Sequence, residues 1–104
     1  MSTLLLICED VEVSENIIQK MSSQYSIWHV RRQRDAMAWL KNHQPESVIM
    51  DLDLLGLGAS DILNQIRQSS PINCTLAIGL CKSPEPLSPL LLEQFDQLIV
   101  NYSI

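Results

Sequence analysis

The sequence has 104 residues, of which 46% are hydrophobic and 18% are charged, and its formal net charge is −5. A chain of this length forms one domain, residues 1–104, with a modest hydrophobic core. Seven basic residues against twelve acidic ones exclude a broad nucleic-acid-binding surface, because such a surface depends on many contacts to phosphates.

Three cysteines are scattered along the chain, at Cys8, Cys74 and Cys81. They are too few for a disulfide framework, and none belongs to a CxxC pair. We therefore expect free, reduced thiols and a cytoplasmic protein. The apolar residues 3–8 are too few to span a membrane and lack the basic lead of a signal peptide, so no membrane partner is expected.

The first half of the chain alternates short apolar runs with amphipathic stretches. Residues 3–8 form a continuous apolar run, which predicts a strand buried on both faces. A helix of about ten residues follows, with Ser14 as the predicted N-cap. Residues 25–30 are rich in aromatic and branched side chains, which predicts a second strand. Residues 34–43 show helical spacing, and residues 47–50 predict a third strand.

The second half continues this alternation with shorter elements. Ser60 or Asp61 begins the third predicted helix, and residues 74–80 form the fourth predicted strand. Prolines make the next segment irregular, and Ser88 followed by a proline allows only a short helix. Residues 98–100 form the fifth predicted strand.

Strands that alternate with helices through short connections predict an α/β fold with a parallel sheet. Acidic residues follow two of these strands: Glu9 and Asp10 after the first, and Asp51 after the third. Ligand sites of such sheets form at the carboxyl ends of the strands, at the point where the strand order reverses. We therefore predict a three-layer, doubly wound, five-stranded parallel sheet of order 2-1-3-4-5, with these acids together at its carboxyl edge.

Several short motifs occur in a characteristic order. Glu9 and Asp10 form an acidic pair after the first strand, and the segment DLDLLG, which starts at Asp51, matches the pattern D-x-x-L-P-G except that Leu55 replaces the proline. Ile66 is followed by an arginine at the expected distance from that segment. With these motifs the chain resembles the receiver domain of two-component response regulators, over almost its whole length.

The resemblance implies a signalling domain rather than an enzyme, with Asp51 as the phospho-acceptor and a histidine kinase or another signalling protein as the partner. An aspartate carboxylate can attack a phosphoryl group and hold it as an acyl phosphate. Mg²⁺ held by a few carboxylates and water would neutralise the charges that meet in this reaction. We expect weak Mg²⁺ binding by Asp10 and Asp51, with Glu9 bound directly or through water.

Three positions depart from the receiver pattern. Gly79 stands where active receivers carry a serine or threonine, and Asn101 stands where they carry a lysine. Leu98 replaces the aromatic switch residue. The acceptor and metal half of the site is therefore present, while the half that senses the phosphoryl group is degenerate.

Two other functions stay open. The first is a pseudo-receiver, a module that binds proteins without being phosphorylated. The second is a phosphatase of the haloacid dehalogenase type, because Asp51 and Asp53 form a D-x-D pair. Too few residues follow Asp53 to supply the remaining catalytic loops of that family.

Receiver domains close with a fifth helix, and only three residues follow Asn101 in this sequence. The resemblance therefore implies that this helix is absent. One helix cannot cover a five-stranded sheet, since helices pack about 10 Å apart and strands about 5 Å apart. We expect an exposed apolar face over the first, third, fourth and fifth strands, which favours a homodimer or a docked partner. Leu90 and Leu91 are a second candidate contact for a partner.

Overall fold

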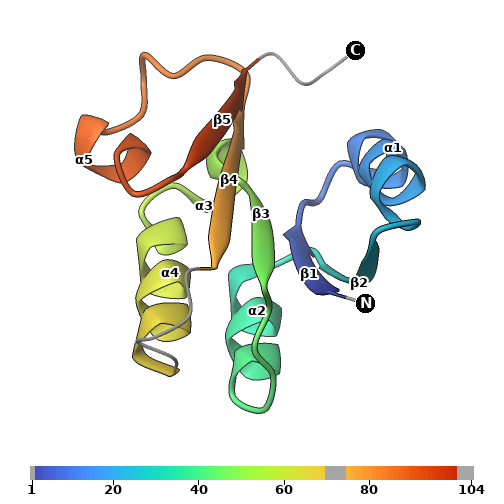
Figure 1. Ribbon diagram of the computed structural model, residues 1–104. Helices are drawn as coiled ribbons and strands as arrows, with labels where there is room; N and C mark the ends of the chain where they lie inside the picture. The colour runs from blue at the N-terminus through green and yellow to red at the C-terminus, as the bar shows by residue number, and fades with distance from the viewer. Residues whose placement is uncertain (1, 70–74, 101–104) are drawn as a thin grey trace.

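The computed structural model describes residues 2–69 and 75–100, which form one sheet with helices on both faces (Figure 1). In chain order the elements are β1 (Ser2–Ile7), α1 (Val11–Met21), β2 (Tyr25–Val30), α2 (Gln33–Leu40), β3 (Ser47–Asp51), α3 (Leu52–Leu55), α4 (Gly58–Ser69), β4 (Leu76–Cys81), α5 (Pro89–Leu92) and β5 (Gln97–Val100). The five strands are all parallel and lie in the order β2-β1-β3-β4-β5, which confirms the predicted fold. No helix in the described part of the chain is long and apolar enough to cross a membrane.

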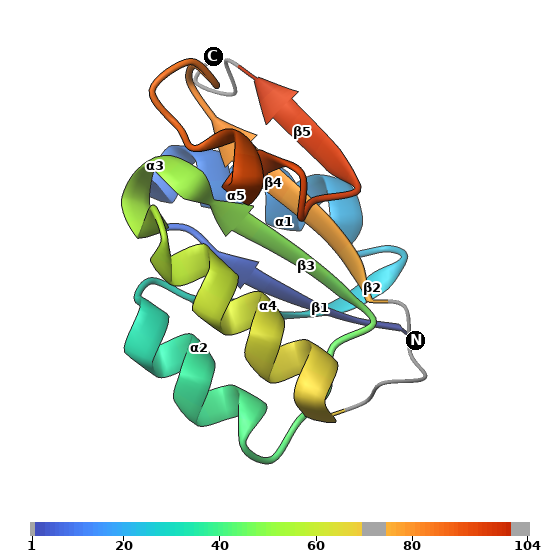
Figure 2. The ribbon, with the colours of Figure 1, turned by 90° about the vertical axis from the view of Figure 1, so that its left-hand side faces the viewer.

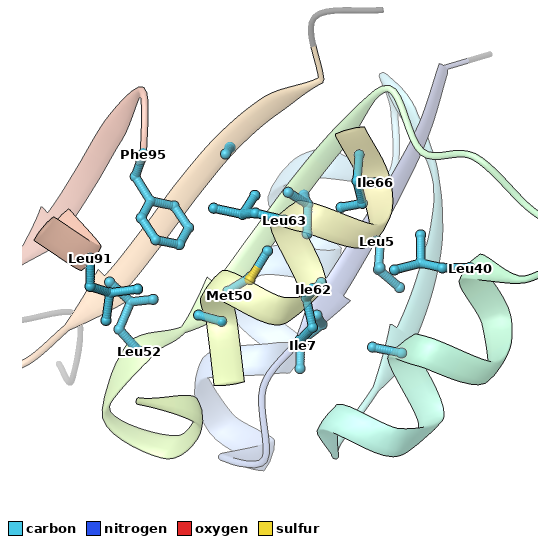
Figure 3. Close-up of a cluster of buried hydrophobic side chains, with 14 of the residues drawn as sticks. Leu5, Ile7, Leu40, Met50, Leu52, Ile62, Leu63, Ile66, Leu91 and Phe95 are labelled. Carbon is cyan, nitrogen blue, oxygen red and sulfur yellow. The ribbon is translucent and has the colours of Figure 1, made fainter. Parts of the chain in front are cut away.

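The sheet is apolar on both faces, and each face carries its own group of buried side chains. Side chains alternate between the faces of a strand, so Leu5 and Ile7 point to one layer while Leu4 and Leu6 point to the other. Figure 2 shows α2 and α4 side by side over the first of these faces. In Figure 3, Leu63 and its neighbours on α4 pack onto the strands of that face. The opposite face packs against α1.

The helix α1 begins earlier than predicted, because Asp10 rather than Ser14 is its N-cap. The Asp10 Oδ1 accepts a hydrogen bond from the Val13 backbone N–H at 3.0 Å. Ser14 lies inside the helix, where its hydroxyl donates to the Asp10 carbonyl at 2.7 Å. Asp and Ser are both good N-caps, and the first of them to follow β1 takes the position. One of the predicted site residues therefore also fixes the start of a helix.

A short helix, α3, follows β3 directly, in a segment for which the sequence predicts no helix. Asp51 is its N-cap, and Gly56 ends it with φ 53°. This left-handed conformation favours glycine. The next helix, α4, begins at Gly58, before the predicted start at Ser60 or Asp61. The chain therefore winds into a helix immediately beyond the candidate phospho-acceptor.

The predicted exposed face is wrong for β1, β3 and β4 in the described residues. Five side chains of these strands on the α1 face are at most 8% exposed: Leu4, Leu6, Ile49, Ile78 and Leu80. Leu76, at the start of β4 on the same face, is 36% exposed. The apolar side chains of α1 reach across the face, since Val13 packs in the same cluster as the residues of β4. On β5, Ile99 is 44% exposed and lines a cavity of about 250 Å³ beside α1.

Candidate functional site

The predicted acids lie at the carboxyl edge of the sheet, where β1 and β3 are neighbours. Glu9 and Asp10 are exposed, whereas Asp51 is 6% exposed. The thiol of Cys8 is affected by two of these acids. Burial is the largest cause that raises the pKa of this thiol, and the negative charges of Asp51 and Asp10 also raise it. The structure therefore brings two of the three predicted carboxylates close to one thiol.

Each of the two aspartates already caps a helix. The Asp10 Oδ1 accepts from Val13 at the start of α1. The Asp51 Oδ1 accepts from the backbone N–H groups of Asp53 and Leu54, at 3.1 and 3.3 Å. Acidic residues that follow a strand often serve only as helix caps, and both aspartates have this structural role in the present chain. Capping fixes both carboxylates in place, which also suits a binding site.

The donor chemistry of this edge fits Mg²⁺, which prefers oxygen ligands. Within residues 2–69 and 75–100, no group of three or more His, Cys, Asp or Glu side chains could hold a metal ion. Mg²⁺ keeps several waters and is commonly bound through one or two carboxylates, so Asp10 and Asp51 alone satisfy its minimum need. Glu9 is exposed and does not complete a cluster of three in this arrangement.

A contact that the sequence reasoning missed joins α3 to the chain after β4. The Asp53 Oδ2 accepts a hydrogen bond from the Lys82 backbone N–H at 2.8 Å. The thiol of Cys81, beside it, has its pKa raised by burial and then by the charges of Asp53 and Asp51. Asp53 therefore holds the loop after β4 against the candidate site, whereas the sequence suggested only a D-x-D pair.

Gly79, which the sequence predicts to be a degenerate switch position, is tightly enclosed by leucines. Gly79 lies in register with Met50 of β3 and Leu98 of β5. A Cβ added at Gly79 would lie 2.7 Å from Leu52 Cδ1 and 3.0 Å from Leu98 Cδ2. Leu52 is completely buried, and Figure 3 shows it beside Leu91. Leucine side chains therefore occupy the space that a larger residue at position 79 would need.

The remaining predicted site residues differ in how far their side chains are exposed. Leu90 is 74% exposed, whereas its neighbour Leu91 is 2% exposed and belongs to the core. Only Leu90 is therefore available for a partner contact. Leu98 is 37% exposed, and Asn101 lies outside the described residues. Cys8 and Cys81 are buried and free, as predicted, and Cys74 also lies outside the described residues.

No protein family model matches the sequence, and no curated protein matches it. Solved structures do match the fold. The chain is similar to a CheY-like response regulator receiver domain from Methylobacillus flagellatus, with a TM-score of 0.78 and 15% identity, over 96% of this chain and 86% of the other.

Two further similar structures contain the response regulator TrrA of Thermotoga maritima. One is TrrA in complex with Mg²⁺-BeF, with a TM-score of 0.76 and 18% identity, over 96% of this chain and 86% of that one. The other is a complex of the histidine kinase ThkA with TrrA, with a TM-score of 0.72 and 18% identity, over 96% and 85% of the two chains. The fold of the present chain is therefore that of response regulator receiver domains.

Proposed function

We propose that the chain is a receiver-type signalling domain of a two-component phosphorelay, with Asp51 as its phospho-acceptor. The observation that carries this proposal is the position of Asp51, which ends β3 beside the acidic exit of β1 in a receiver fold. In the reaction, a carboxylate oxygen attacks the phosphorus of a donor, an acyl phosphate bond forms, and the donor's bond to phosphorus breaks. Because TrrA occurs in a complex with a histidine kinase, a histidine kinase is the proposed donor for this chain as well.

Phosphorylation at Asp51 is expected to be slow and incomplete. Gly79 offers no hydroxyl and Asn101 no positive charge, so the incoming phosphoryl charge lacks the partners that an active receiver supplies. Incubation with acetyl phosphate and Mg²⁺, followed by intact mass spectrometry, should show a minor species that carries one phosphoryl group. Asp51→Asn is the control and should abolish this species. Complete absence of modification in the unaltered protein, with a standard receiver modified alongside, would reject Asp51 as an acceptor.

Mg²⁺ is expected to bind weakly at Asp10 and Asp51, with Glu9 bound directly or through water. Titration with Mg²⁺ should shift the amide NMR signals around Asp10 and Asp51 at millimolar concentrations. Asp10→Asn is a matched control, because asparagine caps a helix as well as aspartate does but carries no charge. It should keep the stability of α1 and weaken the shifts. Unchanged spectra of the unaltered protein at high millimolar Mg²⁺ would contradict the site.

A pseudo-receiver that works by protein contact is the second candidate function. It is favoured by the packing at Gly79, where Leu52 and Leu98 fill the space beside the glycine. A domain of this kind would keep the fold and bind its partner whether or not Asp51 is modified. The two candidates differ in one measurement, since only the first predicts a partner affinity that changes after treatment with acetyl phosphate or beryllofluoride.

A second copy of the chain is the proposed partner at β5. Leu98, Ile99 and Val100 are 37, 44 and 48% exposed, which leaves an apolar edge strand. Sedimentation at high micromolar concentration should reveal a dimer, and Ile99→Lys should return it to a monomer. A monomer at every concentration would contradict dimerisation through this strand.

A further inference from the structure

Positive charge in this acidic protein gathers along the outer face of α2. Three of the seven basic residues, Arg32, Arg34 and Lys41, line an open groove of about 630 Å³. All three are exposed. The floor between them is apolar and comes from Met37 and Ala38. The groove therefore combines a rim of cations with a small hydrophobic surface.

The chain's own carboxylates form no close ion pair with these cations among the described residues, although Asp35 is exposed in the first turn of the same helix. In residues 2–69 and 75–100, no carboxylate oxygen lies within the 4.0 Å of an ion pair from the side chains of Arg32, Arg34 or Lys41. Three basic side chains without a close ion pair are unexpected in a chain with twelve acidic residues and a net charge of −5. An exposed ion pair is worth little by itself, but several unpaired cations in one groove create a local positive field that attracts an anionic partner.

We propose that this groove binds a short acidic segment of another protein. Carboxylates of the segment would pair with Arg34 and Lys41, and an apolar side chain between them would rest on Met37 and Ala38. Arg34 and Lys41 are two turns apart on the helix, about 10 Å, which is the distance between residues i and i+3 of an extended segment. Two acidic residues separated by two others, one of them apolar, match this spacing. The groove is separate from Asp51, so the inference does not depend on phosphorylation.

The charge and the floor of the groove argue against the other anionic or apolar partners. A second copy related by a twofold axis would place two basic grooves against each other, which like charges oppose. Nucleic acid would need a wide basic surface, and the rest of this chain is acidic. A phosphate backbone would also leave Met37 and Ala38 without apolar contacts. A protein segment uses both parts of the groove.

The test is an NMR titration with a synthetic peptide of glutamates around a central leucine. Shifts should be confined to residues 32–41 and should shrink as salt is raised, because salt screens exposed charges. Lys41→Glu should weaken binding about threefold or more, since it replaces attraction by repulsion. Lys20→Glu is the matched control: Lys20 is an exposed lysine in the last turn of α1 and changes the net charge equally. It should leave the affinity nearly unchanged.

Two further arms decide the class of partner. Replacing the central leucine of the peptide by glycine should weaken binding, because the contact with Met37 and Ala38 is lost. A single-stranded oligonucleotide of equal charge should bind more weakly than the leucine peptide. The inference is overturned if residues 32–41 do not shift, or if Lys20→Glu and Lys41→Glu weaken binding equally. It is also overturned if the glycine peptide binds as well as the leucine peptide, or if the oligonucleotide binds as tightly.

Discussion

Leu52→Ala is expected to lower the free energy of unfolding by about 2–5 kcal/mol, the range for truncating a large buried aliphatic side chain. Leu52 is 0% exposed and belongs to the core cluster on the α2 and α4 side of the sheet. Its removal leaves a cavity next to Gly79, which has no side chain to fill it. Urea unfolding followed by circular dichroism measures the loss.

Leu54→Ala is the control for this variant, because Leu54 lies on the same short helix but is 40% exposed. Its loss of stability should be about 0.5 kcal/mol or less, as for most surface changes. Equal stability losses for Leu52→Ala and Leu54→Ala would show that α3 does not pack as the structure describes.

Gly79→Thr is expected to destabilise the domain by about 1–3 kcal/mol through overpacking. The new Cβ would lie 2.7 Å from Leu52 Cδ1, and Leu52 is enclosed by the core. In the Leu52→Ala background the same substitution should cost much less, because the threonine then enters the cavity. Denaturation of the two single variants and the double variant measures this coupling.

The Leu54→Ala background provides the comparison, since there the cost of Gly79→Thr should remain at its full value. Additive effects of Leu52→Ala and Gly79→Thr would contradict the contact between these two positions. A favourable coupling would also explain why this chain does without a hydroxyl residue: restoring one at position 79 requires a smaller neighbour at position 52.

Much of the fold could be predicted from the sequence, because the hydrophobic pattern fixes it strongly. Continuous apolar runs such as residues 3–8 are typical of parallel strands with helices on both faces, and the acids at two strand exits indicated which strands are neighbours. The observed pairing of β1 with β3 confirms this order.

The errors arise where one residue type serves two purposes. The sequence pattern predicts Asp10 as a site residue and Ser14 as the helix cap, whereas the structure shows Asp10 as the cap. Similarly, Asp51 followed by Leu-Asp-Leu-Leu is an N-cap signal for α3, but a helix of only four residues carries too little periodicity to be recognised. The contact between Leu52 and Gly79 depends on α3, so the sequence could not reveal it.

The exposed-face prediction is wrong for β1, β3 and β4 because α1 covers more of the sheet than the width of its own axis suggests. Side chains such as Ile17 and Met21 extend beyond the helix axis, and the sheet twists beneath them. The burial of Ile78 and Leu80 on β4 follows from this reach.

The aromatic side chains of α2 and β2 determine what a spectroscopist can observe in this protein. Both tryptophans of the chain, Trp28 and Trp39, stack on each other with ring centroids 6.2 Å apart. His43 stacks on Trp39 at 4.7 Å. β2 is one of the two outer strands of the sheet, and β1 separates it from β3 and Asp51. Intrinsic tryptophan fluorescence therefore reports directly on the α2 side of the domain, which carries the basic groove, whereas a label introduced beside Asp51 would report directly on that site.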